Sequence, residues 1–209
     1  MKKYELTENY IIFNGRKLFQ IKALIQFGDI KPGYLGGYIE KESNLSHYGN
    51  AWVNDNAIVF GNASVFGSAK IYGNAVICGN AMIFCKAHVR GNAYVNGNAV
   101  ICGDAEICGD IHVGGNANIC GNALIQTNKD YTHIRGFGSE CRTTTFFRLY
   151  NKDIGVKCGC FYGTLNEFRK KVKETHNDNK YAKEYLMIAD LMEYHFSNNE
   201  EINTYENSN

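Results

Sequence analysis

Residues 51–126 read AWVNDN AIVFGN ASVFGS AKIYGN AVICGN AMIFCK AHVRGN AYVNGN AVICGD AEICGD IHVGGN ANICGN ALIQ. The stretch repeats one six-residue phrase thirteen times without an insertion. Alanine begins every phrase except the one that starts at Ile111, and Val or Ile stands two residues later in each. The last two positions are mostly Gly-Asn or Gly-Asp, as in Gly79-Asn80 and Gly103-Asp104.

The spacing within the phrase predicts short strands that are joined by corners. Side chains two residues apart on a strand point to the same side, so the Ala and the Val or Ile should face inward. Gly-Asn should then bend the chain, because Gly has no Cβ and Asn tolerates left-handed backbone conformations. A helix is excluded, since one Gly in every six residues would cost it about 1 kcal/mol each time. The repeat therefore predicts a solenoid of stacked coils.

The phrase resembles the repeat of the hexapeptide-repeat proteins, as in the stretch from Ile77 to Met82. That resemblance implies a mainly β, left-handed parallel β-helix with three phrases in each 18-residue triangular coil. Slightly more than four coils would then form a prism about 20 Å long, at the usual strand spacing. We expect an N-terminal hairpin cap and a small C-terminal α+β module to complete the fold.

The composition of the whole chain limits the classes of function. The 209 residues carry a formal net charge of +1, so nothing favours nucleic acid or an anionic membrane as a partner. No apolar run approaches 18 residues and no charged-then-apolar leader opens the chain, which predicts a cytoplasmic protein. We expect the eight cysteines to be reduced thiols and the protein to need no cofactor.

The N-terminal segment, residues 1–37, reads as a hairpin followed by a connection. Asn14-Gly15 separates two apolar runs, which is a strong signal for a two-residue hairpin turn. We expect the hairpin to cap the open end of the solenoid, which would occupy residues 38–126. Leu45 and His47 fall in register with the Ala and Val positions, so the first coil should begin before residue 51.

Outward side chains that are 18 residues apart should form columns on three faces of the prism. One column runs from Tyr48 through Phe66 and Phe84 to Cys102 and Cys120, and apolar patches of this kind usually mark an interface. Either the C-terminal segment or a second copy of the chain should cover this column. In the resembled family the answer is a homotrimer of parallel prisms, which implies an interface made of Tyr48, Phe66, Phe84, Met82, Val100, Cys102, Cys120, Phe60 and Ile58.

The resemblance also raises an enzymatic alternative, because many hexapeptide-repeat proteins are acyltransferases that use coenzyme A, a histidine base and a loop projecting from the coils. The repeat has two outward histidines, His88 and His112. A histidine beside a nucleophilic substrate can act as a general base. However, the repeat never breaks for a loop, and neither histidine has a carboxylate clearly placed to orient it. Glu106 lies one coil after His88, but the two could equally form a surface pair of little consequence. We therefore expect no catalytic residue in the repeat.

After residue 126 the six-residue pattern stops and a ββαα module is predicted over residues 127–196. Residues 143–148 and 155–161 read as two strands joined by a turn. Thr164 with Glu167 forms a capping box for a helix over residues 165–175. A second amphipathic helix follows Asn179, and the polar tail over residues 197–209 is expected to be disordered.

Two groups of residues in this module are candidate ligand sites. Cys158 and Cys160 should lie on one side of a strand, and with Cys141 and His133 or His176 they could surround zinc. The Cys-x-Cys spacing differs from the usual Cys-x2-Cys, so we expect a half-buried strand and no metal. Hydroxyls, guanidinium groups and free amides near a helix N-terminus suit an anion or phosphate instead. The alternative for the same stretch is a polar turn followed by an ordinary strand. The candidate ligand-binding residues are Arg135, Ser139, Arg142, Thr143, Thr144, Thr145 and Thr164.

The whole chain also resembles small proteins encoded by phages and prophages. The resemblance rests on the segments Lys3–Leu6, Leu35–Ile39 and Cys158–Thr164. It implies a lineage rather than an activity. The leading hypothesis is a non-enzymatic phage-encoded binding or scaffold protein that antagonises host defence, by binding a host protein or by sequestering an anionic small molecule such as a nucleotide signal. The alternatives are a coenzyme A-dependent acyltransferase and a virion or assembly component.

Overall fold

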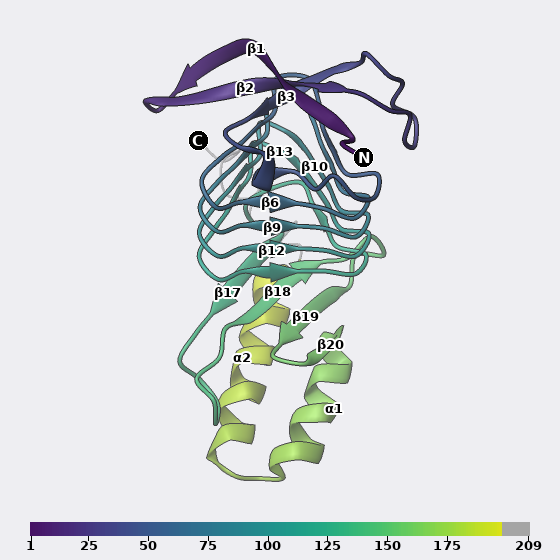
Figure 1. Ribbon diagram of the computed structural model, residues 1–209. Helices are drawn as coiled ribbons and strands as arrows, with labels where there is room; N and C mark the ends of the chain where they lie inside the picture. Colours follow the sequence, from purple (N-terminus) through teal and green to yellow (C-terminus); the bar gives the residue numbers. More distant parts are fainter. Residues whose placement is uncertain (198–209) are drawn as a thin grey trace, which may run out of the picture.

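The computed structural model of the chain describes residues 1–197 and has three parts in a row (Figure 1). A strand-rich cap lies at the N-terminal end, a prism of stacked coils follows, and a module with two helices lies at the other end. Apart from Ser197, the predicted disordered tail lies outside the described residues.

The prism is a parallel β-solenoid, as the sequence predicts, and it has about five turns where the repeat predicts slightly more than four. Partner strands pair in parallel with residues 18 apart, for example Val89 with Ile107. The first face contains β4 (Trp52–Val53), β7 (Lys70–Ile71), β10 (His88–Gly91), β13 (Glu106–Gly109) and β16 (Leu124–Ile125). The second face contains β3 (Leu35–Ile39), β5 (Ile58–Val59), β8 (Val76–Ile77), β11 (Tyr94–Val95) and β14 (His112–Val113). The third face contains β6 (Ser64–Val65), β9 (Met82–Ile83), β12 (Val100–Ile101) and β15 (Asn118–Ile119).

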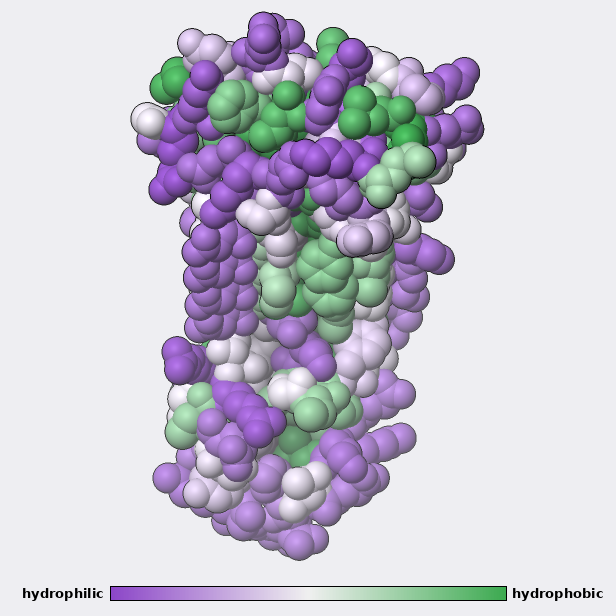
Figure 2. Space-filling model, viewed as in Figure 1, coloured by the Kyte–Doolittle hydropathy of each residue, from purple (hydrophilic) through white to green (hydrophobic). Residues whose placement is uncertain are grey.

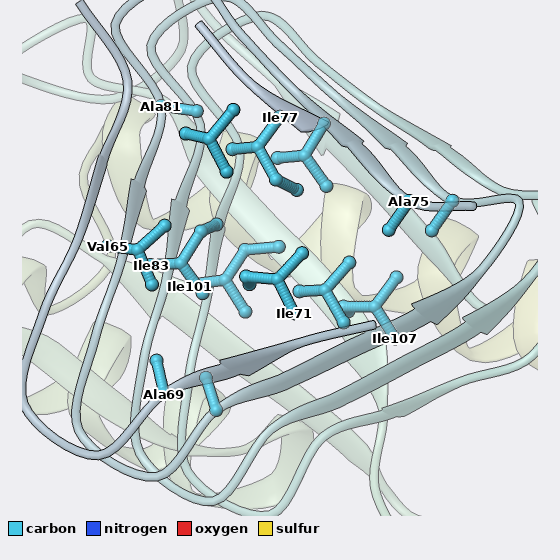
Figure 3. Packing of buried hydrophobic residues seen from close by; sticks show 14 of the residues in the cluster. Val65, Ala69, Ile71, Ala75, Ile77, Ala81, Ile83, Ile101 and Ile107 are labelled. Carbon is cyan, nitrogen blue, oxygen red and sulfur yellow. The ribbon is translucent and has the colours of Figure 1, made fainter. Parts of the chain in front are cut away.

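The interior is filled by the two inward positions of the phrase. Figure 3 shows Ile71, Ile77 and Ile83 entering the triangular interior from its three sides, with Ala69 and Ala75 beside them. All five side chains are fully buried. The small Ala allows the walls to converge while the branched side chain fills the centre, so one close-packed column runs along the prism.

The corners differ from the sequence-based expectation in the role of asparagine. Gly, and not Asn, takes the left-handed backbone, as at Gly79 with a φ of +68°. A Cβ at Gly79 would come within 2.9 Å of the backbone nitrogen of Gly97 in the next coil, so a side chain is excluded there for two reasons. The Asn side chains instead form ladders, in which each amide donates to the side chain one coil further on. The ladders are Asn56–Asn74–Asn92–Asp110 and Asn62–Asn80–Asn98–Asn116.

The N-terminal hairpin consists of β1 (Tyr4–Phe13) and β2 (Arg16–Ala23), and its turn is the predicted Asn14-Gly15. The hairpin extends the second face in the order β1-β2-β3-β5, so it lies beside the first coil. Tyr4 and Ile21 are fully buried in the same core cluster as the inward residues of the coils. The hairpin therefore closes the open end of the interior.

The first coil begins before residue 51, as predicted, but its register is shifted. Leu45, which follows a short 3-10 helix η1 (Glu42–Asn44), pairs with Val65. The repeat predicts His47 at that place. The shift accompanies contacts with the cap, because the Tyr4 hydroxyl donates to the Leu45 carbonyl and His47 Nδ1 accepts from the Lys3 amide. As a consequence Tyr48 does not continue the column of Phe66, and it is 85% exposed.

The C-terminal module has two more strands than the sequence predicts. Its antiparallel sheet runs β17 (Tyr131–Ile134), β18 (Thr144–Arg148), β19 (Ile154–Cys158) and β20 (Phe161–Thr164), and α1 (Leu165–His176) and α2 (Lys180–Phe196) follow. The predicted capping box is present, since Thr164 accepts from the Glu167 amide. Phe147 of β18 is fully buried in the core cluster of the coils, so the module closes the second end of the prism. Among residues 1–197 no helix has the length and apolar character needed to cross a bilayer.

Candidate functional site

Two of the residues predicted for an anion, Ser139 and Arg142, line a cavity in the C-terminal module. The cavity has a volume of about 240 Å³ and lies between the loop after β17, the sheet and the two helices. Phe161 of β20 with Phe168 and Val172 of α1 provide apolar walls, and Phe168 and Val172 are almost fully buried. The apolar walls can contact a ring or an alkyl portion of a ligand, but they provide no hydrogen bonds.

Polar and basic side chains surround the apolar part. Arg142 comes from the loop, and Lys171 and His176 come from α1. Glu140 also lines the cavity and pairs with Arg142 at 3.5 Å, where both side chains are more than half exposed. Such an exposed pair contributes little and can open for a competing anion. The rim thus has two cationic side chains and one carboxylate that balances part of their charge.

Arg142 is positioned by the turn between β19 and β20. Gly159 in this turn has a φ of +55°, and a Cβ there would lie 2.6 Å from Arg142 Nη1. The missing side chain therefore gives the guanidinium room to lie against the turn. The same turn separates Cys158 from Cys160, so the two thiols do not lie on one side of a strand, contrary to the sequence-based expectation.

Cys158 belongs to an internal hydrogen-bond chain at the edge of the cavity. Thr144 Oγ1 donates to Cys158 Sγ at 3.1 Å, and the thiol lies 3.9 Å from the Tyr185 hydroxyl. Burial, together with Cys158, raises the pKa of Tyr185 to about 12, so this hydroxyl stays protonated at neutral pH. The arrangement orients the wall of the cavity and contains no group set up to remove a proton from the thiol.

The structure brings together only part of the predicted ligand set. Ser139 and Arg142 line the cavity. Thr144 and Thr145 are buried and have internal partners, because Thr145 Oγ1 accepts from the Asn118 amide of the third face. Arg135 is exposed and Thr143 is half-buried, and neither lines the cavity.

Thr164 lies apart from this group. It caps α1 and lines a second cavity of about 310 Å³ together with Arg148 and Lys152. The sequence-based ligand set lacks Lys171, and it has His176 only as a candidate zinc ligand, although both lie on the helix that the capping box predicts. The sequence does hold a signal for both residues. Lys171 directly precedes the inward-facing Val172, and His176 follows Val172 by four residues, which places it on the same side of the helix.

No constellation for a metal is found in the described part of the chain, where no group of three His, Cys, Asp or Glu side chains lies close enough to hold an ion. His133 lies elsewhere, stacked at 6.5 Å on Tyr131 beside the end of the second face. The five candidate zinc ligands therefore do not come together around one point among the described residues.

His88 lies half-buried on the first face, with its ring edge-on to Tyr72 at 6.1 Å. Glu106 is its partner in the next coil, as the spacing predicts. That carboxylate is bonded to Tyr150 and Arg90, and the Tyr150 hydrogen bond is the main reason why the pKa of Glu106 lies below its ordinary value. Glu106 therefore fastens the module to the prism and makes no hydrogen bond that orients His88 among the described residues.

His112 lies exposed near the end of the second face. Its Nε2 is 3.2 Å from the Asn96 side-chain oxygen, and its ring is edge-on to Tyr94 at 5.2 Å. An amide oxygen can fix the tautomer of an imidazole but does not stabilise its protonated form as a carboxylate does. The two histidines are on different faces, so within one chain they do not face a common site.

The residues predicted for an oligomer interface have three different environments. Phe66 and Phe84 stack in parallel at 4.8 Å on the third face, as predicted, with exposed Met82 and half-buried Val100 beside them. Figure 2 shows apolar side chains gathered over β6, β9 and β12 between hydrophilic edges.

The ends of the predicted interface are covered within the chain. Ile58 and Phe60 pack against Leu18 of the hairpin and are buried, so they are not free to join an interface. At the other end Cys120 is buried, and Tyr162 of β20 lies over the neighbouring Gly121. Cys102 remains half-buried between these regions.

Comparison with known proteins gives one partial similarity. Over 67 residues the chain is 40% identical to an uncharacterized acetyltransferase, YdcK, of Escherichia coli (strain K12). The match covers 28% of this chain and 21% of that relative, so the chain spans about a fifth of the length of the curated relative that it matches. No family model matches the chain.

Proposed function

We propose that the protein is a non-enzymatic binding protein whose C-terminal cavity holds a small anionic molecule with an aromatic part, such as a nucleotide. The observation that supports this most directly is the combination of Arg142, Lys171 and His176 around walls of Phe161 and Phe168. Guanidinium and ammonium groups bind phosphate or carboxylate oxygens, and the phenyl rings can contact a base. The phage lineage that the sequence resembles suggests sequestration of a host signal as the purpose.

The solenoid has a supporting role in this proposal. Phe147 joins the module to the core of the coils, and Tyr150 fastens it further through its hydrogen bond to Glu106 of the first face. A site on a rigidly held module loses little conformational freedom when the ligand binds. This is consistent with binding and requires no chemical step.

The test uses adenosine monophosphate, guanosine monophosphate and inorganic phosphate in isothermal titration calorimetry. We expect one of the nucleotides to bind and Arg142→Ala to weaken that binding about tenfold or more, because a hydrogen bond to a charged group is lost. Lys183→Ala, which removes an exposed cation on α2 away from the cavity, is the matched control and should bind normally. Absence of heat with all three probes, or normal binding by Arg142→Ala, would contradict the proposal.

The similarity to an acetyltransferase favours a second candidate, a coenzyme A-dependent acyltransferase with His88 or His112 as the base. Two observations argue against it: the coils are not interrupted by a loop, and the Glu106 carboxylate is already bonded to Arg90 and Tyr150. Calorimetry with acetyl coenzyme A tests it. Binding of acetyl coenzyme A, together with an acyl-transfer activity that is lost in His88→Ala or His112→Ala, would establish this candidate in place of the first if AMP and GMP do not bind.

We further propose that the chain assembles through the exposed part of the third face, as a homotrimer. The stacked Phe66 and Phe84 with Met82 form an apolar surface in the middle of the prism. Sedimentation velocity should give three times the chain mass of 23.5 kDa, and Phe84→Glu should give the mass of a single chain. A single-chain mass for the unsubstituted protein at micromolar concentration would exclude the assembly.

A further inference from the structure

Another cavity, distinct from the two described above, lies at the opposite end of the molecule from the anion site. It has a volume of about 300 Å³ and is formed where the segment between β2 and β3 folds over the first face. Ligand pockets usually measure about 300–1,000 Å³, so this one has room for a single small ring system. Neither the repeat nor the capping function requires a cavity here.

The segment that forms the outer wall is held in a defined conformation. Phe27 and Ile30 exchange two backbone hydrogen bonds, at 3.1 and 2.9 Å, around a tight turn at Gly28. The amide of Ala23 donates to the Tyr34 carbonyl, and the amide of Gly33 donates back to the Ala23 carbonyl. The wall is thus preformed, and binding would not require the loop to become ordered first.

The lining is mainly aromatic. Phe27 and Tyr34 come from the loop, and Trp52 and Tyr72 come from the first two coils. The rings of Phe27 and Trp52 meet edge-to-face at 5.2 Å and are almost fully buried. Tyr34 is 44% exposed and Tyr72 is half-buried, so their rings are accessible to a ligand.

Several polar groups of the lining have no partner within the described residues. The Trp52 side chain is 3% exposed, and its Nε1–H makes no hydrogen bond there. A buried donor without a partner is unfavourable, which is why such groups are rare in native proteins. The side-chain amides of Asn50 and Asn54 also line the cavity without a hydrogen bond to the described chain. An amide offers both a donor and an acceptor.

The charges at this cavity are balanced. Lys70 Nζ lies 3.3 Å from Asp29 Oδ2, and both groups belong to the lining. The buried Lys3 ammonium lies behind Phe27, 4.8 Å from the ring centre, and bonds to the carbonyl oxygens of Ala51 and Gly49. Within the described part of the chain, Asp29 and Lys70 are the only charged residues of the lining and leave it without net charge, so the lining favours a neutral ligand over an anion.

We propose that this cavity binds a planar heterocycle with hydrogen-bond donors and acceptors on its rim, which is the chemistry of a nucleobase. The ring would contact Tyr34 and Tyr72, and its rim atoms would pair with the amides of Asn50 and Asn54. The buried Trp52 ring, which also lines the cavity, would form part of the wall behind the bound ring. The inference does not rest on the proposed function, because the two cavities share no residue.

Trp52 is the single tryptophan of the chain, so its fluorescence reports on this cavity alone. Titration with adenosine, guanosine, cytidine and uridine, excited where nucleosides do not absorb, should give a saturable change with at least one of them. Asn54→Ala should weaken the binding about fivefold, the effect of one lost hydrogen bond, and Tyr72→Ala should weaken it by a similar factor through lost ring contact. Circular dichroism establishes that both variants are folded.

The controls separate this site from the other. Tyr10→Ala removes an exposed hairpin tyrosine outside the cavity, and Arg142→Ala alters only the C-terminal cavity, so both should bind the nucleoside as the unsubstituted chain does. Two outcomes would overturn the proposal: no saturable change with any of the four nucleosides, or unchanged affinity in both Asn54→Ala and Tyr72→Ala. Either leaves the result with Arg142 and AMP unaffected.

Discussion

The asparagine that ends most phrases contributes through its side chain, whose hydrogen-bond partners belong to the neighbouring coils. Asn80 accepts from Asn62 at 3.2 Å and donates to Asn98 at 2.9 Å. Each ladder therefore adds a side-chain tie between successive coils at the corner, beside backbone hydrogen bonds such as the one from the Asn80 amide to the Gly97 carbonyl at 2.7 Å. The sequence alone predicts a backbone role for both residues of the Gly-Asn pair. The role of the Asn side chain is not apparent there, because the partner of each amide lies 18 residues away.

Asn80→Ala should lower the free energy of unfolding by about 1–3 kcal/mol, since two hydrogen bonds worth roughly 0.5–1.5 kcal/mol each are lost. Urea denaturation measures the change. Asn122 occupies the same position in a phrase but has no ladder partner among the described residues, so Asn122→Ala should cost less than about 0.5 kcal/mol. Equal losses in the two variants would show that the ladder adds nothing.

Cys102 should react as an unusually acidic thiol. A hydrogen bond from Cys120 in the next coil and, to a lesser extent, the nearby Lys157 ammonium lower the pKa of Cys102 to about 7. The thiolate forms above this pH, so alkylation by iodoacetamide should rise with a midpoint near pH 7, compared with about 8.5 for a free thiol. Peptide mass spectrometry follows the labelling of Cys102 separately from that of the exposed Cys85.

Lys157→Met removes the cation, so it should raise the pKa of Cys102 and move this midpoint to higher pH. Lys173→Met, a matched change on the exposed side of α1, should leave the midpoint in place. If Cys102 and Cys85 were labelled with the same pH dependence, the assigned environment of Cys102 would be wrong.

Among the elements, the N-terminal hairpin does more than close one end of the solenoid. Leu18 of β2 is fully buried against Ile58, Phe60 and Cys78, so the hairpin also covers the apolar part of the second face. A surface that the sequence assigned to contact between chains is thus filled by a contact within the chain.

Leu18→Ala should destabilise the fold by about 2–5 kcal/mol, because it leaves a cavity at this contact. Binding of a hydrophobic dye should increase as Ile58 and Phe60 lose their cover, and chemical denaturation should give the free energy. Ile12→Ala, in the same hairpin but 64% exposed, should change neither quantity appreciably. A small effect of Leu18→Ala would mean that the hairpin is only loosely attached.

The sequence predicts the features that follow from the repeat, but not those that depend on contacts between the repeat and distant parts of the chain. The period of the phrase is local, so it gave the strands, the three faces and the stack of Phe66 on Phe84. It could not give the shift at Leu45, because Tyr4 and Lys3 of the cap determine the path there. The cavity around Trp52 was missed for the same reason: Trp52 is an outward position in the repeat, and only the loop between β2 and β3 buries it.

At the scale of the molecule, the core is continuous from the cap to the module. Tyr4 and Ile21 at one end and Phe147 at the other belong to one cluster of buried side chains. The antiparallel bridge between Ala123 and Leu149 adds a backbone contact where the coils end. We infer that the coils unfold together with both ends, as expected when neighbouring repeats share strong interfaces.

Two spectroscopic probes at opposite ends test this coupling. Trp52 fluorescence reports on the N-terminal end, and far-ultraviolet circular dichroism at helical wavelengths reports on α1 and α2. Phe147→Ala should cost about 3–5 kcal/mol and lower both transitions together. If the dichroism transition moved while the Trp52 transition stayed in place, the two ends would be independent.

Because each coil of the repeat contains 18 residues, the length of the prism can change only by whole coils. Duplicating or deleting 18 residues would keep every corner, ladder and inward side chain in register, while any other length would break them. The distance between the Trp52 cavity and the Arg142 cavity could therefore vary between related chains only in steps of one strand spacing, about 4.8 Å. A ligand or partner that spans both ends would be matched to a whole number of such steps.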